Sequence, residues 1–192
     1  MSHEIFKNET KALHRKLDQS PLLKNIMAKH VTEKDYLHFL LFHESMNLAL
    51  NDCFKESCEK LNFPFSDRLV YIQNDIEAFS LNRSIGTIVQ NHTPTLNMSI
   101  EPCLGVVYVL EGARHGNKYI FQHLNKKLDL QLSESSYLNM QSPINWAEIV
   151  YMLDQLDVKR RQLNVLQAQN MFTYLIQLSD YLKQTLNEEY TV

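Results

Sequence analysis

The stretch EPCLGVVYVLEGARHGNKYIFQHL, residues 101–124, decides the fold of this chain. Three of the four glycines in the whole sequence, Gly105, Gly112 and Gly116, lie within it among mostly apolar residues. The apolar content predicts a largely buried helix, and spacings of seven and four place the three glycines on one face of it. Since each glycine costs a helix about 1 kcal/mol relative to alanine, we expect this bare face to lie against another helix or a flat ligand.

The composition is that of a globular protein and excludes several classes. With 192 residues, 44% of them hydrophobic and 21% charged, the chain is predicted to form a single domain over residues 1–192 with one core. Few glycines and prolines argue against an all-β chain. A net charge of −3 provides no basic field for nucleic acid. No apolar run is long enough for a membrane span.

The remaining segments point to a reducing compartment and to an all-α fold. The start MSHEIFKNET lacks the features of a signal peptide, and three cysteines without a CxxC motif indicate free thiols in the cytoplasm. Apolar periodicity predicts about seven or eight helices. Besides 101–124 they include residues 5–17, 21–30, 33–60, 66–80, 85–89 and a C-terminal region from 145 that breaks near 157–161. Thr32 is predicted to cap the third of these, with Asp35 completing an imperfect capping box.

His14 is the first candidate ligand. It falls beside the apolar face of the N-terminal helix, and Asp18, four residues later, can bond one ring nitrogen and leave the other for a metal. The alternative is a partly buried structural histidine with a surface ion pair. Lys7 and Lys11 lie on the side of the helix that carries His14, where lysines alone indicate a solvated face.

Several stretches resemble the heme oxygenase family. LGVVYVLEGARHG resembles the distal helix of these enzymes, most closely in the bacterial, phytochrome-associated branch. NETKALHRKLD resembles the proximal helix, with its threonine, iron-binding histidine and following acidic residue, and MFTYLIQLSDYL resembles the last helix. The stretches occur in the family's order and span most of the chain. The resemblance implies a single-domain helical fold with heme between the first helix and the glycine-containing distal helix.

The resemblance also implies an activity and a set of site residues. Family members use heme as cofactor and substrate, and with O2 and electrons from a ferredoxin or a reductase they produce biliverdin, carbon monoxide and ferrous iron. His14 is then the proximal ligand of the heme iron, oriented by Asp18, while Gly112 and Gly116 form a thin wall on the distal side. Six further residues are expected to hold heme, because they match the family or carry a suitable charge: Lys7, Lys11, Thr10, Phe172, Arg160 and Arg161.

The distal stretch departs from the family at Ala113, His115 and Asn117. Ala113 stands where a small hydroxyl residue is usual, so Arg114 and His115 are expected to supply the polar groups of the distal side. We expect His115 to hold water or lie on the propionate side. If it bound the iron itself, O2 would be excluded and the protein would bind, store or sense heme without turnover.

A third class consists of di-iron or thiaminase-like members of the same helical superfamily. His38, His43 and Glu44, with Glu111, are the candidate ligands of a di-iron site, although the repeated ExxH pairs of such sites are absent. A thiaminase-like enzyme needs a reactive cysteine, and no partner is visible in the sequence for the three candidates. These candidates are Cys53, Cys58 and Cys103.

Overall fold

The computed structural model describes residues 2–78, 103–128 and 137–189, and these ranges are helical without a β-strand. They contain six α-helices and a short 3-10 helix, a count slightly below the predicted seven or eight. The elements are α1 (Ser2–Asp18), α2 (Glu33–Lys60), α3 (Leu69–Ala78), α5 (Cys103–Lys127), η1 (Tyr137–Asn139), α6 (Trp146–Asp154) and α7 (Val158–Glu189). The predicted helix at 85–89 and the first two residues of the predicted helix at 101–124 lie outside the described residues.

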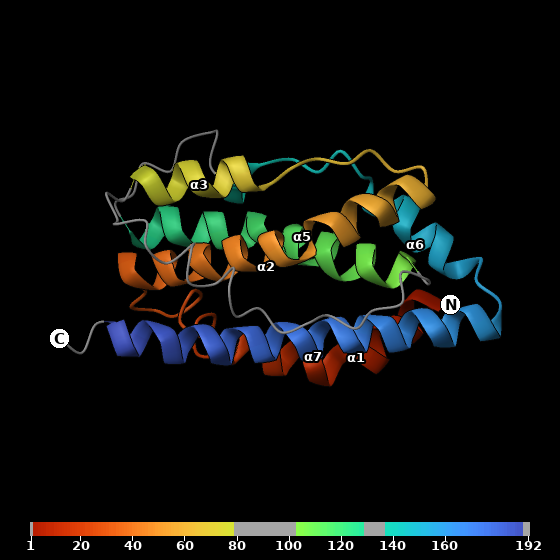
Figure 1. Ribbon diagram of the computed structural model, residues 1–192, viewed down its shortest axis with the longest axis horizontal. Helices are drawn as coiled ribbons and strands as arrows, with labels where there is room; N and C mark the ends of the chain where they lie inside the picture. The colour runs from red at the N-terminus through yellow and green to blue at the C-terminus, as the bar shows by residue number, and fades with distance from the viewer. Residues whose placement is uncertain (1, 79–102, 129–136, 190–192) are drawn as a thin grey trace.

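The helices pack in a layered bundle around α5 (Figure 1). α1 lies against α7, α7 also packs on α5, and α2 covers another side of α5 and is itself covered by α3. α6 and η1 pack on α5 as well. In Figure 1 both α1 and α5 run from right to left, so these two helices are roughly parallel.

Local sequence signals explain most of the helix ends. Thr32 caps α2 in a complete capping box. The backbone amide of Asp35 donates to the Thr32 hydroxyl, and the backbone amide of Thr32 donates to the Asp35 carboxylate. Asn145 caps α6 by accepting a bond from the backbone amide of Ala147. The predicted break in the C-terminal region is confirmed, because residues 155–157 separate α6 from α7.

Two expected helices differ in the structure. Residues 21–30 form successive turns rather than a helix, because Leu22 and Ile26 are drawn into the core from a segment too short to hold a helix by itself. The helix expected from Ser66 begins later, at Leu69, whose backbone amide donates to the side chain of Asp67 at 2.9 Å.

Buried apolar side chains from all six α-helices form one core cluster. α5 lies at its centre, with Val106 and Val107 fully buried and Leu110 3% exposed. None of the helices in the described ranges is long and apolar enough to cross a membrane.

Candidate functional site

His14 projects from α1 into solvent with its imidazole held in place. Its Nδ1 lies 3.0 Å from an oxygen of Asp18, as predicted from their spacing, and 57% of the His14 side chain is exposed. The bond to Asp18 raises the pKa of His14, against a smaller lowering by partial burial. The ring edge of His14 meets Phe172 of α7 with centroids 5.5 Å apart, and Phe172 is buried. The structure therefore brings together three residues that the sequence analysis assigned to one site.

α5 contacts both α1 and the turns that follow α1. Toward their N-terminal ends, the rings of Phe6 and Tyr108 meet edge to face at 5.3 Å. Beyond the C-terminal end of α1, the His123 ring donates to the carbonyl oxygen of Ala28 at 3.0 Å. His14 follows Phe6 by eight residues and Gly116 follows Tyr108 by eight. Because the two helices are roughly parallel, both residues therefore lie about 12 Å beyond the contact between Phe6 and Tyr108, at about the same level.

The three glycines of α5 meet three different environments. A Cβ on Gly105 would lie 2.5 Å from the carbonyl oxygen of Asn164, so this glycine permits close packing of α5 on α7. A Cβ on Gly112 would make ordinary contact with the Trp146 ring at 3.5 Å, and one on Gly116 would meet nothing within 4 Å. The expected bare face thus serves helix packing at Gly105 and is open at Gly116, the glycine level with His14.

His115 is exposed and stacks on the indole of Trp146, with ring centroids 5.7 Å apart and planes 18° from parallel. Trp146 also meets Tyr108, at 5.6 Å, and His3, at 6.3 Å. This aromatic cluster, which the sequence analysis did not anticipate, covers the Gly112 end of the face. The water-holding role of His115 stays a prediction.

The other residues assigned to heme fall in two places. Lys7 and Lys11 are exposed on α1, whereas Thr10 is 3% exposed and donates to the carbonyl oxygen of Phe6. Arg160 pairs with Asp157, and Arg161 donates to the carbonyl oxygen of Leu156 at 3.1 Å. These arginines precede Phe172 by about 16–18 Å along α7, so the structure separates them from the His14 region.

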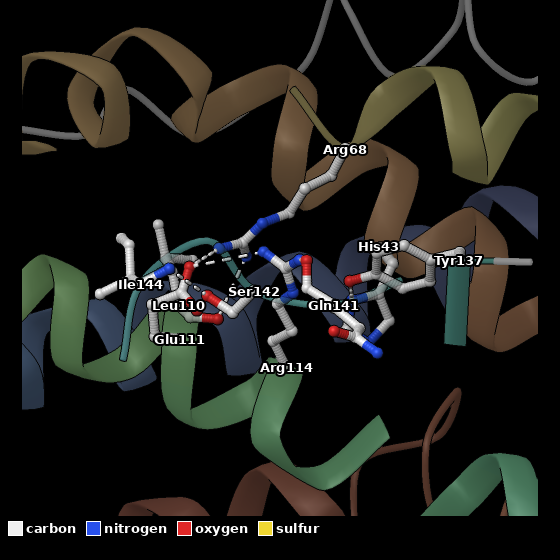
Figure 2. Close-up of polar contacts among 9 residues, drawn as sticks. All are labelled: His43, Arg68, Leu110, Glu111, Arg114, Tyr137, Gln141, Ser142 and Ile144. Carbon is white, nitrogen blue, oxygen red and sulfur yellow. Dashed lines mark hydrogen bonds and ion pairs between the residues drawn. The ribbon is translucent and has the colours of Figure 1, made fainter. Parts of the chain in front are cut away.

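On its opposite face α5 carries a buried charged cluster that the sequence analysis missed (Figure 2). Arg68, just before α3, donates to both the Glu111 carboxylate and the carbonyl oxygen of Leu110. Ser142 donates to the other oxygen of Glu111 at 2.6 Å. Arg114 lies 3.8 Å from Glu111 and donates to the carbonyl oxygen of Gln141. The guanidinium group of Arg114 therefore lies in the buried cluster and points away from the glycine face, so the expected role of Arg114 on the distal side is wrong.

A second buried group adjoins this cluster. The hydroxyl of Tyr137 lies 2.8 Å from Nδ1 of His43, and the Asp75 carboxylate accepts bonds from the Tyr36 hydroxyl and the backbone amide of Tyr137. Burial, with a contribution from Arg68, lowers the pKa of His43 to about 3. His43 therefore stays neutral at ordinary pH.

These contacts argue against the di-iron and thiaminase-like alternatives. Glu111 is paired with arginine, and within the described ranges no three His, Cys, Asp or Glu residues are grouped as metal ligands, His38 and Glu44 included. All three cysteines are thiols that form no disulfide bond within the described ranges. Burial raises the pKa of Cys53, and it raises that of Cys58 to about 12, the reverse of an activated thiolate.

No protein-family model matches the chain, and no curated protein matches it in sequence. Among solved structures, its fold is similar to that of heme oxygenase-1 from the cyanobacterium Synechocystis sp. PCC6803, crystallised in complex with heme. The TM-score is 0.68, the match covers 98% of this chain and 95% of that one, and 11% of the residues are identical. The predicted all-α, heme-oxygenase-like fold is confirmed. At this identity the similarity establishes the fold and not the reaction.

Proposed function

We propose that this protein binds heme between α1 and α5 through His14 and cleaves it with O2 to biliverdin, carbon monoxide and ferrous iron. A ferredoxin or a reductase supplies the electrons. The proposal treats residues 1–192 as one domain of the bacterial phytochrome-associated type, working in a reducing cytoplasm that suits its three cysteine thiols. One observation supports it above all. An exposed imidazole, bonded to Asp18 through Nδ1, lies level with the open backbone of Gly116 on a neighbouring helix.

The residues around His14 fit a heme group. Because Nδ1 is bonded to Asp18, Nε2 is the nitrogen left to bind iron, and the carboxylate makes it a stronger ligand. Phe172 supports the imidazole from the α7 side. Lys7 and Lys11, exposed on the helix that carries His14, are suited to pair with the propionates. Bound heme supplies both the iron that activates O2 and the macrocycle that is oxidised.

α5 supplies the opposite wall. Gly116 leaves space that any side chain would fill, and Trp146 with His115 covers the Gly112 end and limits solvent entry there. His115 is exposed beside this wall, where its imidazole can hold a water molecule and pass a proton. In this proposal the thin wall positions the macrocycle, and His115 organises water at its edge.

A second function is a heme-binding, storage or sensing protein without turnover. This function is favoured by the small number of polar side chains near the distal wall. Ala113 carries no hydroxyl, and Arg114 is bonded to Gln141 and paired with Glu111 in the interior. His115 alone then remains of the two side chains expected to replace that hydroxyl.

Hemin titration tests binding. We expect hemin to give a stoichiometric ferric spectrum and to quench the fluorescence of Trp146, the sole tryptophan. His14→Ala should lose the normal spectrum and regain it with imidazole. His30→Ala, which changes another exposed histidine, should behave as wild type. An unchanged spectrum in His14→Ala would refute the ligand assignment, and absence of hemin binding would refute both functions.

Turnover separates the two functions. With a reductant in air, the hemin complex of an oxygenase should convert to biliverdin, detected by absorbance. His115→Ala should slow this conversion and leave hemin affinity unchanged if His115 organises water. A low-spin ferric wild type that becomes high-spin in His115→Ala would instead make His115 an iron ligand. Tight hemin binding without biliverdin, with every reductant tried, would leave only the heme-binding function.

A further inference from the structure

A surface hollow lies next to the buried charged cluster on the α5 face that does not take part in the proposed heme site. It is lined by Phe65, Ser66, Tyr71 and residues 139–143. Its volume of about 800 Å³ is well above that of a single inorganic ion. The lining presents hydroxyl and amide groups and has no carboxylate among its described residues.

The cluster behind this hollow has an excess of positive charge. The side chains of Arg68, Glu111 and Arg114 are 2%, 3% and 4% exposed, so two guanidinium groups share one carboxylate out of contact with water. Nε of Arg68 and both Nε and Nη1 of Arg114 have no hydrogen-bond partner among the described residues. A buried cation without its own counter-ion is costly, and unpaired N–H groups add to that cost.

The wall between the hollow and the cluster is one residue thick. Gln141 and Ser142 line the hollow, and the same two residues bond Arg114 and Glu111 (Figure 2). Burial and Arg68 lower the pKa of Arg114, whereas Glu111 and, less strongly, Tyr137 and Tyr71 raise it; Tyr71 lines the hollow. A negative group beside Tyr71 is therefore within the electrostatic reach of Arg114.

We propose that this hollow binds a small organic anion through a carboxylate or phosphate group. The hydroxyl groups of Ser66 and Tyr71 donate to its oxygens, and Arg114, buried behind Gln141 and Ser142, supplies the counter-charge without touching the anion. The anion neutralises the second guanidinium of the cluster, so binding stabilises the folded protein. The site is separate from the proposed heme site and does not depend on it.

Calorimetry and thermal unfolding with defined probes test the site. Sodium phosphate and sodium succinate are compared with sodium chloride at equal ionic strength. We expect one of the two anions, or both, to bind once per chain and to raise Tm in a saturable way that chloride does not reproduce. Binding of phosphate alone identifies a phosphate ester as the ligand class, and binding of succinate alone identifies a carboxylate.

Variants assign the binding to named residues. Arg114→Gln should weaken binding at least tenfold, and Tyr71→Phe should weaken it several-fold without touching the buried charges. Arg15→Gln, which removes an exposed arginine of α1, should bind as wild type. If Arg114→Gln does not fold, Ser66→Ala combined with Tyr71→Phe gives the same test. The proposal is overturned if neither anion binds once per chain, or if the Arg114 and Tyr71 variants, or that double variant, bind like wild type.

Discussion

The two faces of α5 differ in packing and charge: the glycine face is partly open, and the opposite face buries a charged cluster. On one face a side chain added at Gly116 would meet nothing within 4 Å, and Gly112 lies beside the ring of Trp146. On the other face Glu111 and Arg114 are almost completely buried and bonded to residues before α3 and after η1. The comparison teaches that one helix can leave an open strip of backbone on one face while its opposite face buries a network of paired charges.

The largest expected effect comes from breaking the charged face. Glu111→Gln keeps the side-chain shape but leaves Arg68 and Arg114 buried without a carboxylate. We expect a loss of about 3–5 kcal/mol in the free energy of unfolding, measured by urea denaturation at pH 7. Glu148→Gln, an exposed change on α6, is the control. A loss no larger than that of the control would mean that solvent reaches the two arginines.

The lowered pKa of His43 predicts how the stability of the protein changes with pH. Its pKa is about 3 in the folded protein and about 6.5 when unfolded, so between these values the unfolded chain binds one more proton. The free energy of unfolding should therefore fall with decreasing pH, by up to about 1.4 kcal/mol per pH unit from this group. Urea unfolding between pH 7 and pH 5 should show a shallower slope in His43→Gln than in wild type. The same slope in both proteins would contradict the buried, neutral histidine.

Alanine substitutions at Gly105 and Gly116 test the difference between the packed and the open part of the glycine face. Gly105→Ala forces a Cβ to 2.5 Å from a backbone oxygen of α7, and we expect a loss of about 1–3 kcal/mol in stability. Gly116→Ala meets no neighbour and should gain up to about 1 kcal/mol from helix propensity, while weakening hemin binding. Thermal unfolding and hemin titration of both variants check this. Equal hemin affinity of Gly116→Ala and wild type would place the ligand elsewhere.

The smallest effect on stability is expected for the exposed pair of His14 and Asp18. The Asp18 bond raises the pKa of His14, so the stability it contributes is present below the unfolded pKa of about 6.5 and is lost as pH rises through the folded pKa. Because both side chains are more than half exposed, Asp18→Asn should cost less than about 1 kcal/mol. NMR titration of the His14 ring protons should show a lower pKa in this variant. An unshifted titration would remove Asp18 as the cause.

Short-range features of the site and fold were predictable because they depend on spacing within one helix. The Thr32 and Asp35 capping box, the His14 and Asp18 bond and the break before α7 all follow from residues at most four apart or from a single interruption. The helix expected at 21–30 was wrong, because core packing outweighed local propensity in a short segment.

The long-range features were not predictable from one sequence. Arg68 and Glu111 are 43 residues apart, and Glu111 and Ser142 are 31 apart. Nothing in the spacing of these residues marks them as partners, and Arg114 looked equally suited to the opposite face. Trp146 likewise reaches Gly112 only because α6 packs against α5.

The sequence by itself determined the all-helical class, the bond that holds His14 and the single face shared by three glycines, since each follows from the fixed repeat of a helix. Only the tertiary structure decided which glycine is open, which arginine is buried and which carboxylate neutralises it. Those outcomes depend on which helices become neighbours, and neighbours are selected by burial of the whole apolar core rather than by any local pattern.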